Sequence, residues 1–166
     1  MKYVYIGKIV NTHGIKGELR ILSDFKYKDK VFKSNMLIYI GKDKVEEKIV
    51  SYRKHKNFDM VCLDGYNNIN EVLKYKGLYA YVNKEDIELD KDKYLDEDII
   101  GMDVIVDNKV IGKVDNIEKN VQYLIVVKNK DKEYLVPYND FFVKEIDINN
   151  KKIIINNIEG LFDMEW

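Results

Sequence analysis

The stretch that most constrains the fold is residues 3–24, which reads as a strand, a tight glycine loop and a second strand. Residues that favour β-structure fill both ends, and Gly14 and Gly17 interrupt them. Lys16, between the two glycines, suggests a phosphate cradle. The spacing is not that of a P-loop, however, and no helix follows that could present its N-terminus to an anion. We therefore expect a structural β-turn with His13 packed against it.

The same stretch carries a family resemblance. Residues 6–21 read IGKIVNTHGIKGELRI, and a Ser23-Asp24 step follows them. This phrase resembles the opening of the RimM family of ribosome maturation factors. In that family a strand ending in valine, glycine and a basic residue precedes H-G-[ILV]-[KR]-G-E and then a threonine-aspartate step. Ser23 stands where threonine is commoner. A phrase of this length is specific.

The second half of the chain carries a separate resemblance to the same family. The family has the motif Y-Y-x-x-D-L-I-G at the start of its PRC-barrel domain. This motif resembles the segment Tyr94-Leu95-x-x-Asp98 and the residues IIG that follow it directly. Residues 134–138 resemble the leucine-isoleucine-proline-phenylalanine step of that domain, and its ending resembles residues 143–147 together with Gly160-Leu161. The second tyrosine of the family's pair is Leu95 here.

The resemblance covers nearly the whole chain in two consecutive parts. It implies an all-β fold of two small β-barrels in tandem with one short helix. We place an N-terminal RimM-type barrel at 1–83, an acidic linker at 84–98 and a PRC-barrel at 99–166. The resemblance also implies a non-enzymatic assembly factor for the small (30S) ribosomal subunit, which binds the head ribosomal protein numbered nineteen and assists 16S rRNA maturation.

Local patterns agree with a strand-rich chain. Of 166 residues, 13 are Tyr, 6 are Phe and only 1 is Pro, which suits strands better than a helical bundle. The one convincing helix is expected over 68–76, where Asn68 can cap the start, Glu71 completes a capping box and Gly77 ends the helix. Gly112 interrupts a later strand and is expected to form a β-bulge.

Cysteine and carboxylate patterns limit the possible chemistry. Cys62 is the only cysteine and reads as a buried strand residue, so we expect no disulfide, no cysteine metal cluster and a reducing, cytoplasmic location. The run Asp90-Lys-Asp92-Lys-Tyr94 lacks the third ligand and the glycine of a calcium loop. We expect no metal, no cofactor and, because no apolar run is long enough, no membrane span.

The formal charge of −1 hides a division between the two halves. Residues 1–83 carry 16 Lys and Arg against 9 Asp and Glu, a net charge of +7, whereas the remainder carries 12 against 20, a net charge of −8. Eight of those 20 acids lie between Glu85 and Asp98. Such asymmetry suggests two surfaces with different partners, RNA for the basic half and a basic protein for the acidic half.

Two basic stretches are candidates to face rRNA. Lys26 and Lys28 alternate with aromatic residues, a composition that can stack bases and contact phosphates. The alternative is a mobile surface loop. Arg53, Lys54 and Lys56 are expected in a basic turn at a hairpin tip, where RNA contact and simple solvation remain open alternatives.

The expected contact with the ribosomal protein rests on Tyr94, Leu95 and Asp98. Tyrosine is a favoured interface anchor because it combines apolar area with one hydroxyl group. The alternative is that Tyr94 and Leu95 plug the end of the barrel.

No catalytic constellation is visible in the sequence. His13 and His55 fall in different predicted loops, and no serine or cysteine lies in a nucleophile motif. We therefore expect a non-enzymatic protein. As a separate expectation, the protein is a monomer. Two alternatives are an enzyme that uses His13 and Asp24, and a stand-alone RNA-binding module.

Overall fold

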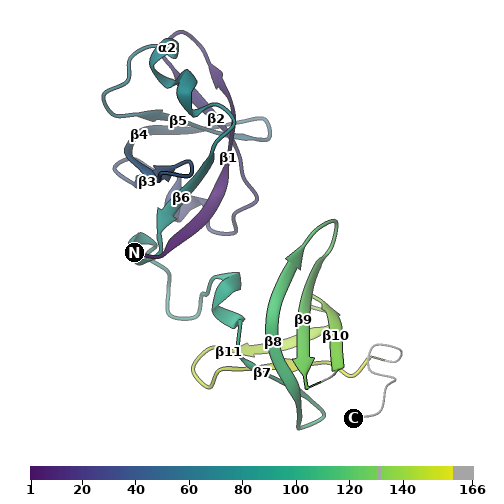
Figure 1. Ribbon diagram of the computed structural model, residues 1–166. Helices are drawn as coiled ribbons and strands as arrows, with labels where there is room; N and C mark the ends of the chain where they lie inside the picture. The colour runs from purple at the N-terminus through teal and green to yellow at the C-terminus, as the bar shows by residue number, and fades with distance from the viewer. Residues whose placement is uncertain (131, 159–166) are drawn as a thin grey trace. The chain divides into compact units, whose positions relative to one another are not determined.

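The computed structural model describes residues 1–130 and 132–158, and the chain divides into two units, Met1–Leu89 and Asp90–Trp166 (Figure 1). The segment 84–98, predicted to join the domains, spans the end of the first unit and the start of the second. It contains the 3-10 helix Lys84–Asp86 (η2) and the start of another, Asp96–Ile99 (η3). No described helix is long and apolar enough to cross a membrane.

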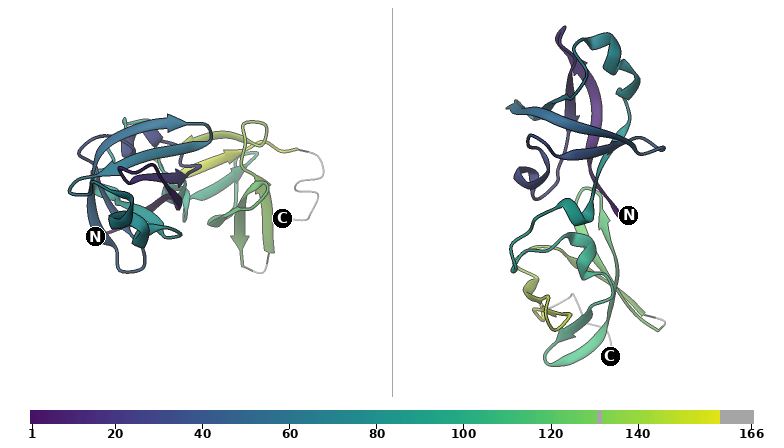
Figure 2. Two further views of the ribbon diagram at one scale, coloured as in Figure 1. Left: turned by 90° about the horizontal axis from the view of Figure 1, so that it is seen from above. Right: turned by 90° about the vertical axis from the view of Figure 1, so that its left-hand side faces the viewer.

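The first unit is a closed barrel in which every neighbouring pair of strands is antiparallel. The strand order is β1-β2-β5-β4-β3-β6, and β6 closes the barrel by pairing with β1 (Figure 1). Figure 2 gives two further views of the ribbon. The strands are β1 Tyr3–His13, β2 Glu18–Leu22, β3 Leu37–Ile40, β4 Val45–His55, β5 Phe58–Leu63 and β6 Tyr79–Asn83.

The barrel interior follows from the period-two pattern of its strands. Leu19 and Ile21 of β2 and Ile38 and Ile40 of β3 alternate with other residues along their strands and are buried. Each such aliphatic side chain contributes roughly 1.5–3 kcal/mol relative to an exposed one. The barrel core therefore depends on alternating aliphatic residues, and the side chains on the outer faces of its strands are not needed to fill that core.

The predicted helix is present, in a shortened form. Helix α2, Ile69–Val72, begins after Asn68, whose side chain accepts hydrogen bonds from the Asn70 and Glu71 amides in a capping box. The last turn tightens into a 3-10 helix, η1, at Leu73–Tyr75. The capping pattern was therefore predicted correctly from the sequence.

A further one-turn helix, α1, spans Lys28–Val31, where a surface loop was one of the two alternatives. Val31 and Phe32 are buried, so tertiary packing accounts for a helix that local propensity did not predict.

The second unit contains one six-stranded sheet in the order β10-β9-β8-β7-β12-β11. Among the described strands only β12 and β7 pair in parallel. In Figure 1, β8, β9 and β10 run across the direction of β7 and β11. The strands are β7 Asp103–Val106, β8 Lys109–Lys119, β9 Tyr123–Asn129, β10 Lys132–Pro137, β11 Val143–Asp147 and β12 Lys152–Ile155.

One apolar core unites this sheet. It includes Val104 of β7, Val114 of β8, Ile125 of β9, Val136 of β10 and Ile153 of β12. The register between β7 and β8 shifts between Val104 and the next residue, beside the predicted bulge at Gly112. The all-β fold class is confirmed; the expected match at Gly160-Leu161 lies outside the described residues.

Candidate functional site

The glycine loop between β1 and β2 joins two paired strands. His13 ends β1 opposite Glu18, and both Gly14 and Gly17 have positive φ, +73° and +83°. A Cβ atom at Gly17 would lie 2.7 Å from the Asn68 carbonyl oxygen, whereas one at Gly14 would meet nothing within 4 Å. Gly17 is therefore the position where the start of α2 approaches the loop too closely for a side chain.

A cluster of charged residues gathers beside this loop. It consists of His13, Glu18, Arg20, Arg53 and His55, which we call the His–Arg cluster. The guanidinium of Arg53 donates two hydrogen bonds to the Glu18 carboxylate, at 2.8 and 2.7 Å. A guanidinium nitrogen of Arg20 lies 3.0 Å from Nδ1 of His13. These contacts bring together residues from β1, β2 and β4.

The two histidines lie near each other, which the sequence did not lead us to expect. Their ring centroids are 6.0 Å apart. The prediction that they occupy separate loops was wrong, because His13 ends β1 and His55 ends β4. Desolvation, followed by the positive charges of Arg53 and Lys56, lowers the pKa of His55. The cluster contains two arginines and one carboxylate, so it has an excess of positive charge that suits a phosphate group.

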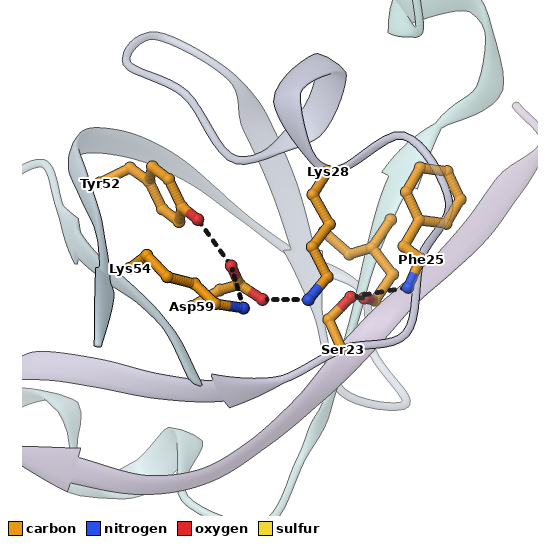
Figure 3. Close-up of polar contacts among 7 residues, drawn as sticks. Ser23, Phe25, Lys28, Tyr52, Lys54 and Asp59 are labelled. Atoms are coloured by element: carbon orange, nitrogen blue, oxygen red, sulfur yellow. Dashed lines mark hydrogen bonds and ion pairs between the residues drawn. The ribbon is translucent and has the colours of Figure 1, made fainter. Parts of the chain in front are cut away.

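A second polar network surrounds Asp59 of β5 (Figure 3). Asp59 is fully buried. Its carboxylate accepts a 2.6 Å hydrogen bond from the Tyr52 hydroxyl and lies 3.0 Å from Nζ of Lys28 and 3.8 Å from Nζ of Lys54. Burial, together with the hydrogen bond to Asp59, raises the pKa of Tyr52 to about 12. The network joins α1, β4 and β5.

The five candidate rRNA-facing cations therefore differ in their surroundings. Lys28 and Lys54 pair with Asp59, and Arg53 pairs with Glu18. Two further cations complete the set: Nζ of Lys26 lies 5.6 Å from the Tyr27 ring centroid, and Lys56 occupies a turn with φ +54°.

The predicted basic turn at a hairpin tip is only partly correct. Strand β4 continues to His55, so Arg53 and Lys54 are paired strand residues, opposite Met60 and Asp59 respectively. Asp59 and Tyr52 were not predicted from the sequence, although one acid inside the otherwise apolar strand FDMVCL was an available signal. Cys62, expected to be buried, is half-buried.

In the second unit, the three candidate contact residues lie around η3. Leu95 is buried, and its amide donates a 2.8 Å hydrogen bond to the Asp98 carboxylate. Tyr94 packs against the apolar core. Burial, followed by the proximity of Tyr94 and Asp96, raises the pKa of Tyr138. Tyr94 is therefore half-buried in this segment, whereas Leu95 is buried.

Within the ranges 1–130 and 132–158 no three His, Cys, Asp or Glu side chains are grouped as a metal site would require.

Comparison with known proteins decides the family. The RimM N-terminal domain family matches residues 4–87, and the RimM PRC barrel domain family matches residues 96–161. The chain belongs to the RimM family.

Two relatives agree with this assignment. A protein named ribosome maturation factor RimM from Staphylococcus haemolyticus is 46% identical, with 96% of this chain and 99% of the relative covered. A protein of the same name from an Exiguobacterium species is 40% identical, with 99% of both chains covered. The resemblance seen in the opening phrase and in the second half is thereby confirmed.

A solution structure of the N-terminal domain of RimM from Thermus thermophilus is 19% identical, covers 54% of this chain and 98% of that chain, and gives a TM-score of 0.46. The assignment to the RimM family rests on the sequence matches alone.

Proposed function

We propose that this RimM protein is a non-enzymatic assembly factor for the small (30S) ribosomal subunit that assists 16S rRNA maturation in the cytoplasm. The observation that carries the proposal is the match of both RimM domains, in order, across nearly the whole chain. Curated relatives that span the chain at 40% and 46% identity are named ribosome maturation factors.

The first unit would contact rRNA in the precursor particle. The net charge of +7 over residues 1–83 and the excess positive charge of the His–Arg cluster support this role. Arg53 belongs to that cluster and Lys56 follows its His55 along the chain, while Lys26, Lys28 and Lys54 extend the basic surface. Phosphate contacts of this kind give affinity without sequence specificity.

The second unit would bind the ribosomal protein numbered nineteen. Its net acidic charge suits a basic ribosomal protein, and Tyr94 offers a half-buried ring at the start of the unit. Because Leu95 is buried and Asp98 binds the Leu95 amide, we assign these two a supporting role. They hold the segment in which Tyr94 is presented.

Precursor binding tests the proposal as a whole. Tagged full-length protein, captured from a lysate of cells that are assembling ribosomes, should retain small-subunit precursors and the ribosomal protein numbered nineteen. Capture of naked rRNA without that protein would favour a stand-alone RNA-binding module. Capture of neither would contradict the assignment.

The RNA contact has a separate test. The triple variant Arg53→Ala, Lys54→Ala, Lys56→Ala should bind precursor particles more weakly, and the salt slope should fall by about 0.7–0.9 for every phosphate that is no longer bound. A matched control replaces three lysines of the second unit by alanine: Lys113, Lys119 and Lys128. If both variants change the slope equally, the basic half has no special role.

The protein contact is tested by calorimetry with the purified ribosomal protein. Tyr94→Ala should weaken binding by roughly 2 kcal/mol if the ring is an anchor, whereas Tyr94→Phe should lose little. Replacing the exposed acids Asp90 and Asp92 by Asn should act mainly on the association rate. Wild-type affinity in Tyr94→Ala would remove Tyr94 from the interface.

A further inference from the structure

Five tyrosines form a continuous group on the outer side of the first barrel. They lie on the neighbouring strands β1, β6 and β3, and we call them the tyrosine face: Tyr3, Tyr5, Tyr39, Tyr79 and Tyr81. The register explains the grouping, because Tyr81 lies opposite Tyr5 on one side and opposite Tyr39 on the other. Opposite residues of an antiparallel pair place their side chains on the same face.

The rings support one another edge to face. Tyr5 contacts Tyr79 and Tyr81 with ring centroids 5.6 and 5.9 Å apart, and Tyr3 contacts Tyr39 at 5.2 Å. These are favourable separations for T-shaped aromatic pairs. The arrangement is therefore ordered by the barrel and does not depend on a partner to form.

Much ring surface nevertheless remains exposed. Tyr39 is only 4% exposed, but Tyr3, Tyr5 and Tyr79 are 37%, 46% and 50% exposed. The outward face of an antiparallel sheet is normally polar, and a cluster of half-exposed aromatic rings there indicates a surface that binds something.

Lysines accompany these rings. Nζ of Lys44 lies 4.3 Å from the Tyr81 ring centroid and 5.5 Å from that of Tyr3. Nζ of Lys8 lies 5.8 Å from the Tyr79 ring centroid. Aromatic faces that can stack on bases, next to cations that can reach phosphates, are the combination that binds single-stranded nucleic acid.

We propose that the tyrosine face binds an unpaired stretch of RNA, with bases stacked on Tyr5 and Tyr79 and phosphates near Lys8 and Lys44. This inference rests on the proposed rRNA role and adds to it a surface distinct from the His–Arg cluster. RNA is favoured over an apolar protein segment because lysines lie beside the rings and residues 1–83 carry a net charge of +7.

The test compares ring with apolar area in the full-length protein. The double variant Tyr5→Leu, Tyr79→Leu keeps apolar area but removes stacking, and Tyr5→Phe, Tyr79→Phe keeps both rings. Binding of a fluorescently labelled single-stranded oligoadenylate, followed by anisotropy, should fall by at least about fivefold per ring in the leucine variant. The phenylalanine variant should bind like wild type, and a duplex of the same length should compete poorly.

Two controls accompany the measurement. Tyr123 in the second unit also has a lysine near its ring, with Nζ of Lys119 5.7 Å from the ring centroid, so Tyr123→Leu is a matched substitution that should leave affinity unchanged. Lys8→Gln and Lys44→Gln should each reduce the salt slope for single strands by about 0.7. Thermal unfolding of every variant shows whether the barrel is intact.

The outcomes separate this inference from the proposed function. A folded leucine variant with wild-type affinity for oligoadenylate would overturn the stacking site, as would equal loss in the leucine and phenylalanine variants. If the wild type binds duplex and single strands alike, stacking is also excluded. Precursor capture that persists in such a case would leave the assembly role in place, whereas failure of precursor capture by wild type would contradict the assembly role itself.

Discussion

The Asp59 network and the tyrosine face belong to the same barrel, yet their tyrosines have opposite surroundings. The tyrosine of the Asp59 network is bound to a buried acid, whereas those of the tyrosine face contact one another and most of them remain partly exposed. At Asp59, the Tyr52 hydroxyl and the Lys28 ammonium are held by a fully buried carboxylate. On the tyrosine face, the rings of Tyr5 and Tyr79 support each other and stay about half exposed.

This difference shows that residue type does not reveal whether a side chain is available to a partner. A lysine that neutralises a buried acid stabilises the fold, and its loss disturbs folding before it disturbs binding. The loss of an exposed ring on an intact sheet should instead disturb binding before it disturbs folding. Substitutions of Asp59, Tyr52 and Lys28 should therefore change stability, and substitutions on the tyrosine face should change binding.

The largest effect is expected at Asp59. Asp59→Ala removes the acceptor of the Tyr52 hydroxyl and the partner of Lys28, so the free energy of unfolding should fall by about 3 kcal/mol. Urea unfolding measures this, and Asp59→Asn, which keeps the shape, should lie between the alanine variant and wild type. Tyr5→Leu should change the same quantity by less than about 1 kcal/mol. Equal losses at Asp59 and Tyr5 would remove the contrast between the two regions.

The two loop glycines offer a smaller contrast of the same kind. Gly17→Ala combines positive φ with a close approach to Asn68, and should cost about 2 kcal/mol or more, whereas Gly14→Ala meets only the positive φ and should cost about 1 kcal/mol. Thermal unfolding of the two variants compares them. If both leave the melting temperature unchanged while precursor binding is lost, the loop is a contact site and not a structural turn.

The pH dependence of stability gives a sharper view of the Asp59 network. The pKa of Tyr52 rises from 10.0 to about 12 in the folded protein, so folding favours the neutral phenol. Its contribution is fully present below pH about 10 and is lost as pH rises through about 12. Urea unfolding across this range should show a loss in wild type that is smaller in Tyr52→Phe. Identical pH profiles would contradict the role of this hydrogen bond.

The smallest effect on stability is expected at Arg53. Its pair with Glu18 is at the surface, with the Arg53 side chain 48% exposed, and exposed ion pairs contribute little because solvent screens them. Arg53→Ala should therefore shift the midpoint of urea unfolding less than Gly14→Ala does. Glu18→Gln is the matched partner variant. A shift as large as that of Asp59→Ala would place Arg53 with the groups that maintain the fold.

Residue order alone was sufficient to predict the features that depend on neighbouring residues. The strand, glycine loop and second strand of residues 3–24, the capping box at Asn68 and the family phrase are all local patterns of this kind. The all-β class followed from the same local patterns together with the RimM resemblance.

Which distant residues meet could be learned only from the folded barrel. The His13 ring lies near the His55 ring, Lys28 forms an ion pair with Asp59, and Tyr5 lies opposite Tyr81. Strand order and register bring these residues together around a closed sheet. Register depends on the whole set of pairings and not on any one segment. Helix α1 has the same origin, since the burial of Val31 stabilises a turn that its own sequence does not specify.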